Sequence, residues 1–86
     1  MNNSIDRAHY YTLRQVADMT GSTYINVWRW VNRGYLRATF FGYQYAVLGA
    51  DLLYTMERWQ RRELELDTPR GGRLHMPIAA PVAAQV

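Results

Sequence analysis

The 86-residue sequence predicts a small, mainly helical domain with one β-hairpin, and three observations support this fold class. Hydrophobic residues make up 49% and aromatic residues 14% of the chain, which is enough apolar material for a packed core. Apolar residues recur at helical spacing in three segments, and two short β-prone runs lie between the second and the third. A chain of this length forms one core, which excludes a large multidomain enzyme.

The first predicted helix follows Thr12. Leu13 and Val16 begin one apolar face, and Thr12 with Gln15 three positions later matches a capping box. Gly21 lies where the apolar pattern stops, and glycine commonly follows the last residue of a helix. We therefore expect the first helix to end just before Gly21.

The second predicted helix spans about 24–32, because Ser22 or Thr23 offers an N-cap and Gly34 offers a stop. Apolar residues at i, i+3 and i+4 predict a buried stripe, which consists of Val27, Trp30 and Val31. The opposite face carries Tyr24, Asn26, Trp28, Arg29 and Arg33. Two short helices joined by a glycine-containing turn are typical of a helix–turn–helix reader of DNA.

Two β-prone runs follow, Leu36 to Phe41 and Tyr43 to Val47, and Gly42 between them permits a tight turn. These runs predict a small hairpin. A third helix is expected from Gly49 or Ala50 to about Leu66. The aromatic residues interpreted as core residues are Trp30, Trp59, Phe40 and Tyr45.

The composition changes near Asp67, where a mixed aromatic and charged sequence gives way to a segment rich in Gly, Pro and Ala. The first nine residues are also polar and without a pattern. We therefore expect the folded domain over 10–66, a flexible N-terminus over 1–9 and a flexible C-terminal tail over 67–86.

The charge distribution favours an anionic partner. All ten basic residues are Arg, and the formal net charge is +3. The planar guanidinium suits phosphate and guanine edges, although a GC-rich genome produces the same bias. No acidic residue lies between Asp18 and Asp51, whereas Arg29, Arg33 and Arg37 lie in this stretch. Unless the gap is incidental, the local potential there favours the approach of nucleic acid.

Several function classes are excluded by what the sequence lacks. It has no Cys for disulfides or thiolate metal sites, no Lys for a phosphate-binding loop and no apolar run long enough for a bilayer. His9 and His75 fall outside the expected domain, which leaves no basis for a metal site. We expect no catalysis, no cofactor, no metal and no membrane contact, and a cytoplasmic location in the absence of a signal peptide.

Four groups of residues resemble phage excisionases and the wider MerR-like winged helix–turn–helix group. They are Tyr11-Thr12-Leu13, Val27-Trp28-Arg29-Trp30-Val31, Gly34 and Tyr43-Gln44-Tyr45. The resemblance spans about Tyr10 to Trp59, and the run Arg29-Trp30-Val31 is its most specific part. It implies a winged helix–turn–helix in which the hairpin is the wing.

In that family the second helix enters the major groove of double-stranded DNA and the wing reaches the adjacent minor groove. Excisionases bind attachment sites cooperatively, bend the DNA and direct an integrase towards prophage excision, and they make or break no bonds. The resemblance therefore implies cooperative self-association along DNA in the cytoplasm of a bacterial host cell. It also makes an integrase a candidate partner for the C-terminal tail.

The resemblance carries over Ile25, Arg29 and Asn32 as groove-facing positions, with Tyr43 at the wing tip. The sequence departs from lambda-type excisionases, which have an acidic residue at the position of Ile25 and Arg at those of Asn32 and Tyr43, so a different target is expected. Together with the exposed face and the acid-free stretch, the candidate DNA-binding residues are Thr23, Tyr24, Ile25, Asn26, Trp28, Arg29, Asn32, Arg33, Arg37 and Tyr43.

Two alternatives remain open at this point. A small MerR-like transcription regulator or a phage repressor has the same kind of domain. A protein-interaction module with this fold would not bind DNA at all, and it would show a much weaker dependence on salt.

Overall fold

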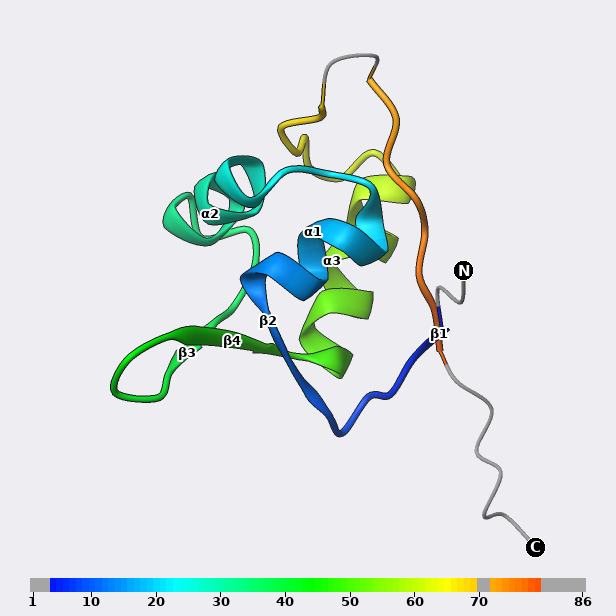
Figure 1. Ribbon diagram of the computed structural model, residues 1–86. Coiled ribbons are helices and arrows are strands. Elements are labelled where there is room, and N and C mark those ends of the chain that lie inside the picture. Colours follow the sequence, from blue (N-terminus) through cyan, green and yellow to red (C-terminus); the bar gives the residue numbers. More distant parts are fainter. Residues whose placement is uncertain (1–3, 70–71, 80–86) are drawn as a thin grey trace, which may run out of the picture.

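The computed structural model describes residues 4–69 and 72–79 of the chain. Over these residues the chain forms three helices, a three-stranded antiparallel sheet and a parallel pair of two short strands (Figure 1). The elements in chain order are β1 (Ser4–Ile5), β2 (Tyr10–Thr12), α1 (Leu13–Thr20), α2 (Tyr24–Asn32), β3 (Thr39–Phe40), β4 (Tyr45–Leu48), α3 (Gly49–Gln60) and β5 (Ile78–Ala79).

Helices α1 and α2 begin at the caps that the sequence predicts. The Gln15 N–H donates to Thr12 Oγ1 (3.1 Å) and the Thr12 N–H donates to Gln15 Oε1 (2.9 Å), which confirms the capping box. At α2 the Asn26 N–H donates to Thr23 Oγ1 (3.1 Å), so Thr23 rather than Ser22 is the N-cap.

Each of the three helices ends in the same hydrogen-bonding motif. A residue in the left-handed conformation turns the chain, and the N–H group of the next residue donates to a backbone oxygen in the last turns of the helix. The left-handed residues are Gly21 (φ 72°), Gly34 (φ 79°) and Arg62 (φ 63°). The returning hydrogen bonds are Ser22 N–H to the Ala17 oxygen (2.9 Å), Tyr35 N–H to the Trp30 oxygen (3.0 Å) and Glu63 N–H to the Arg58 oxygen (2.9 Å).

Helix α3 ends at Gln60, so the predicted extension to Leu66 is wrong. No glycine marks this end, because Arg62 adopts the left-handed conformation itself. Across this turn, Arg61 Nε donates to the Glu63 carboxylate (2.7 Å), and this hydrogen bond lowers the pKa of Glu63 and raises the pKa of Arg61. The chain then folds back, and Leu66, which lies in a non-helical segment, has a buried side chain.

The antiparallel sheet has the strand order β2–β4–β3. The predicted hairpin is present with shorter strands, and Phe40 lies opposite Tyr45 across it. Strand β2, which the sequence analysis did not predict, pairs with β4 on the other side, so that Thr12 lies opposite Ala46. The sheet therefore fixes the start of α1 beside the hairpin.

Helix α3 begins without a side-chain cap, because Leu48 has no polar group to offer. Backbone carbonyls take this role: the Gly49 N–H donates to the His9 oxygen (2.8 Å) and the Ala50 N–H donates to the Arg7 oxygen (3.0 Å). The approach is so close that a Cβ atom at Gly49 would collide with the carbonyl group of Asp6. The segment before β2 is thus packed directly on the start of α3.

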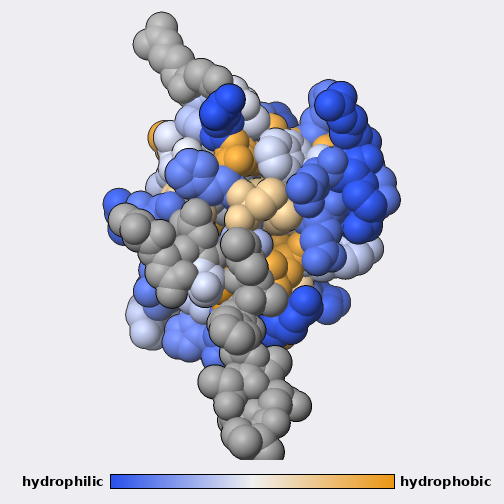
Figure 2. Space-filling view, turned by 90° about the vertical axis from the view of Figure 1, so that its right-hand side faces the viewer, coloured by the Kyte–Doolittle hydropathy of each residue, from blue (hydrophilic) through white to orange (hydrophobic). Residues whose placement is uncertain are grey.

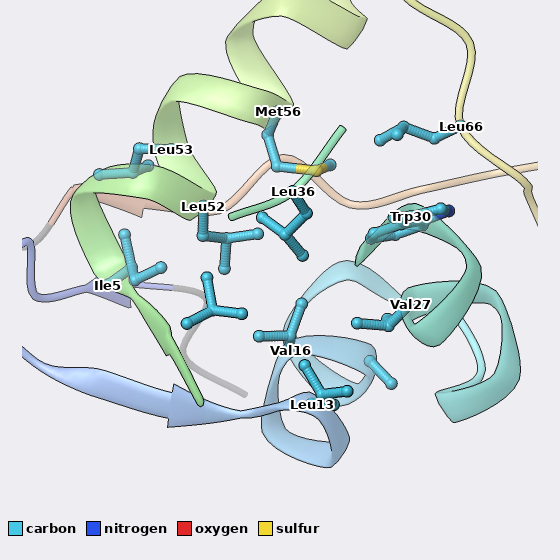
Figure 3. Packing of buried hydrophobic residues seen from close by; sticks show 12 residues of the cluster. Ile5, Leu13, Val16, Val27, Trp30, Leu36, Leu52, Leu53, Met56 and Leu66 are labelled. Carbon is cyan, nitrogen blue, oxygen red and sulfur yellow. The ribbon is translucent and has the colours of Figure 1, made fainter. Parts of the chain in front are cut away.

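The core lies between the three helices, with Leu36 among Val16, Leu52 and Met56 (Figure 3). Its buried members are Ile5, Leu13, Val16, Ala17, Val27, Trp30, Leu36, Val47, Leu52, Leu53, Met56 and Leu66. Ile5 is fully buried although the sequence analysis placed it in a flexible N-terminus. The predicted domain limits of 10–66 are therefore too narrow at the N-terminal side.

The limits are also too narrow at the C-terminal side. Leu74 and Met76 pack against the core, and β5 pairs in parallel with β1. The His75 N–H donates to the Thr20 oxygen (2.6 Å), so this segment runs beside the end of α1 (Figure 1). Figure 2 views the side along which it runs and shows apolar surface flanked by hydrophilic surface. Leu74 and Met76 are only two apolar residues, and two residues form too weak a pattern for the sequence to predict this packing.

Candidate nucleic-acid interface

The outward face of α2 holds large apolar side chains away from the core. Val27 and Trp30 are fully buried, whereas Tyr24, Ile25 and Trp28 are 45%, 62% and 46% exposed. Single exposed apolar residues are ordinary, but a contiguous group on one helix face marks a binding surface. The predicted exposure of Tyr24 and Trp28 is confirmed.

A groove of about 500 Å³ lies between α1, α2 and the β3–β4 hairpin. A shallower hollow of about 300 Å³ adjoins it along α2, and the two share Tyr24 and Trp28. The groove is lined by Thr12, Leu13 and Arg14 from the start of α1, by Tyr24 and Trp28 from α2, and by Phe40, Tyr43, Gln44 and Tyr45 from the hairpin.

Two arginines contribute the charge of this surface. Arg14 lies over the Tyr24 ring, with its guanidinium carbon 5.6 Å from the ring centroid, and Arg29 lines the shallower hollow. None of the residues that line the two hollows is acidic. The surface therefore combines cations with aromatic faces, which suits a polyanion that carries stacked rings.

The hairpin adds a cluster of exposed aromatic side chains. Phe40 and Tyr45 contact each other across the strands (ring centroids 4.9 Å apart), and Phe41 meets Tyr10 edge to face (5.1 Å). The interpretation of Phe40 and Tyr45 as core residues is wrong, because both are exposed. The hairpin extends past the helices, so these side chains cover each other instead of entering the core.

No family model matches the chain, and no curated protein or solved structure matches it significantly. In the part of the chain that the structure describes, no group of three or more His, Asp or Glu residues is placed to hold a metal ion. No helix within 4–69 and 72–79 is long and apolar enough to cross a membrane.

Five predicted residues lie on this surface and remain open to a partner. Tyr24, Trp28 and Tyr43 line the groove, and Ile25 lines the adjoining hollow together with Arg29. Arg29 is exposed, so the structure brings it together with the aromatic side chains as the sequence analysis expected.

Other predicted residues are placed differently. The side chain of Asn26 is only 8% exposed, so its assignment to the outward face is wrong: position 26 turns towards the body of the protein beside Val27. Thr23 is exposed, but its hydroxyl oxygen caps α2. Asn32 is exposed, and its amide Nδ2 donates to the Trp28 oxygen (3.1 Å) within α2.

The two remaining arginines lie near carboxylates. Arg33 forms an ion pair with Asp67 (2.8 Å), a residue that the sequence places far away. Arg37 lines a different hollow, which Asp51 also lines. The stretch without acidic residues is thus partly neutralised by the fold, and Arg33, a candidate DNA-binding residue, is paired with a carboxylate and lines neither of the two hollows.

Sequence analysis missed Arg14, Gln44 and the aromatic pair Phe40–Tyr45 as parts of this surface. A signal was present for the pair, since a tight turn around Gly42 places Phe40 opposite Tyr45. No comparable signal existed for Arg14, because its approach to Tyr24 depends on how α1 packs against α2.

Proposed function

We propose that the chain binds double-stranded DNA as a winged helix–turn–helix protein, with α2 in the major groove and the β3–β4 hairpin as the wing. The observation that carries the proposal is the groove between α2 and the hairpin, which combines Arg14 and exposed aromatic rings and has no acidic lining. An α-helix with its side chains is about 10–12 Å wide and the major groove of B-DNA is about 12 Å wide, so α2 fits this groove.

Arg29 is the residue proposed to read a base. It lies four positions after Ile25 on the outward face of α2, and it has an exposed side chain. A guanidinium in this position pairs with the O6 and N7 atoms of guanine, whereas Ile25 offers apolar contact to a thymine methyl group. Arg14, at the edge of the groove, is proposed to contact a phosphate.

The biological role proposed for this binding is that of an excisionase: cooperative binding at attachment-site DNA, bending, and direction of an integrase. The support is the resemblance of the α1–α2–hairpin residues, together with the shortness of α3. MerR-like activators continue into a long coil, whereas α3 has 12 residues and the chain then folds back onto the core. An integrase contact through residues 67–86 belongs to the same proposal.

The test is fluorescence anisotropy with labelled duplexes from the attachment site and the promoter that flank the gene, at several salt concentrations. Four to six phosphate contacts predict a log–log slope of about −4 to −5. Arg29→Ala is expected to lose about 1–3 kcal/mol on the preferred duplex and to relax site preference. Arg7→Ala is the matched control, because it removes the same charge from an exposed side chain outside both hollows.

Equal losses in both variants would contradict base reading by Arg29, and a salt-independent affinity would contradict DNA binding. The exposed aromatic side chains of the groove favour a second candidate, a protein-interaction module, for which a flat salt response is expected. Stepwise cooperative complexes on attachment-site DNA support the excisionase role. A single discrete complex at the promoter supports the transcription regulator instead.

A further inference from the structure

The tip of the β3–β4 hairpin projects beyond the helices (Figure 1). The Phe41 N–H donates to the Gln44 oxygen (2.9 Å), which closes a tight turn over Gly42 and Tyr43. Tyr43 is 82% exposed, the largest exposure among the large hydrophobic side chains described as exposed. An aromatic ring this exposed to water buries its apolar surface only when a partner contacts it.

The hairpin has no charge with which to hold a phosphate. No Arg, Lys, Asp or Glu occurs from Ala38 to Ala50. A wing of this composition differs from one that follows the DNA backbone by electrostatic contacts, because such contacts require cations or many donors. What the tip offers is an aromatic face and the amide of Gln44.

The tip is also braced. The ring contact of Phe40 with Tyr45 lies behind it and joins β3 to β4, and the contact of Phe41 with Tyr10 joins the end of β3 to β2. Ordering a flexible side chain or loop on binding costs free energy, and a braced hairpin has less of that freedom to lose. The tip therefore has the rigidity that a wedge requires.

The position of the tip relates it to the bases next to the groove. Tyr43 and Gln44 line the groove together with Arg14 and Trp28, so a phosphate strand at Arg14 passes beside the tip. We infer that the Tyr43 ring inserts as a wedge between two stacked base pairs and kinks the duplex at that step. This inference rests on the proposed DNA binding, and it assigns to Tyr43 a role other than a phosphate or base-edge contact.

Wedge residues in other DNA-binding proteins partly unstack one step and kink DNA by about 20–90°. Flexible pyrimidine–purine steps are deformed at the lowest cost, so the preferred step is TA or CA. The wedge thereby adds sequence preference at a position where the protein makes no hydrogen bond to a base edge.

The experiment uses the full chain and a 30-base-pair duplex selected from a randomised pool. A 2-aminopurine base is placed at each position in turn, since its fluorescence rises when it is unstacked. The expected result is a rise at one step with the wild-type protein and with Tyr43→Phe. Tyr43→Ala is expected to lose this signal and the bend, and to bind roughly tenfold more weakly.

Tyr54→Ala is the matched control, because Tyr54 is an exposed tyrosine of α3 that does not line the groove. It is expected to leave fluorescence, bend and affinity unchanged. If Tyr43→Ala binds and bends DNA as the wild type does, the wedge is wrong and the proposed function stands. If the wild-type protein binds no duplex even at low salt, both fail together.

Discussion

Arg33, the C-cap of α2, donates hydrogen bonds from Nη1 to both carboxylate oxygens of Asp67, at 2.9 and 2.8 Å, although the two residues are 34 positions apart. The backbone carbonyl of Asp67 also accepts a hydrogen bond from Trp30 Nε1 (3.0 Å). Asp67 thus fastens the segment after α3 to the C-terminal half of α2. The consequence is that one of the predicted DNA contacts serves to hold the fold together.

Replacement of Asp67 by Asn tests this relationship. Because the Arg33 side chain is half exposed and the Asp67 side chain is partly exposed, loss of the ion pair is expected to cost about 1 kcal/mol in the free energy of unfolding. The substitution leaves the backbone carbonyl that binds Trp30 in place and frees the Arg33 guanidinium. DNA affinity is then expected to rise, and the slope of log affinity against log salt concentration is expected to become steeper by about 1. Urea unfolding and anisotropy titrations measure the two effects, and an unchanged slope in D67N would show that Arg33 stays away from phosphate.

Gly49 is the position where a small change is expected to do the most damage. A Cβ atom there would collide with backbone at Asp6, which cannot move without breaking the hydrogen bonds that cap α3. Gly49→Ala is therefore expected to destabilise the protein by roughly 3 kcal/mol, at the upper end of overpacking effects.

Gly34→Ala is the control for this substitution. Gly34 is left-handed, but no atom lies within 4 Å of its added Cβ, so the expected cost is the conformational strain alone, about 1–2 kcal/mol. Chemical denaturation of both variants gives the comparison. Equal destabilisation would mean that the N-terminal segment yields easily and does not hold the start of α3.

Arg62 offers the opposite case, a site where glycine is expected to stabilise. Its left-handed conformation (φ 63°) costs an L-residue about 1–2 kcal/mol. Glycine avoids this strain, but it offsets part of the benefit because it loses more conformational entropy on folding. Arg62→Gly is expected to raise the free energy of unfolding by about 0.5–1 kcal/mol. Gln60→Gly, in the last turn of α3, is expected to lower it by a similar amount. A loss of stability in R62G would indicate that the arginine side chain holds the helix end.

These positions show which parts of the fold were open to prediction. The cap at Thr12 and the stops at Gly21 and Gly34 depend on residues within one turn, so the local sequence predicted them. The end of α3 at Gln60 was missed because Arg62, which turns the chain there, belongs to a residue type that gives no signal for a left-handed conformation. The chain folds back there because Leu66 and Asp67 find partners in the core and on α2, and such contacts between distant residues leave no periodic pattern.

The same distinction applies to the candidate interface. The outward positions of Tyr24, Trp28 and Arg29 followed from helical spacing. Asn26 was misplaced, because a residue at the border of the buried stripe is covered or exposed according to how the neighbouring elements pack. The acid-free stretch was a property of the chain order, which the fold changed by bringing Asp67 to Arg33.

The two tryptophans of α2 give the clearest separation of binding from stability. Trp28 is half exposed in the groove, whereas Trp30 is fully buried and donates its indole N–H to Asp67. Trp28→Ala is expected to change the free energy of unfolding by less than about 0.5 kcal/mol, as surface substitutions do. Its DNA affinity is expected to fall by about 1 kcal/mol or more, with an unchanged salt slope, because an aromatic contact and not a phosphate contact is lost.

Trp30→Phe is expected to show the reverse pattern. It leaves the Asp67 carbonyl without its indole donor and removes ring volume from the core, which together are expected to cost roughly 2–3 kcal/mol of stability. Its affinity for DNA, measured at a temperature where the variant is folded, is expected to stay near that of the wild type. If W28A destabilises the fold as much as W30F does, Trp28 is a structural residue, and the outward face of α2 loses its main apolar contact with DNA.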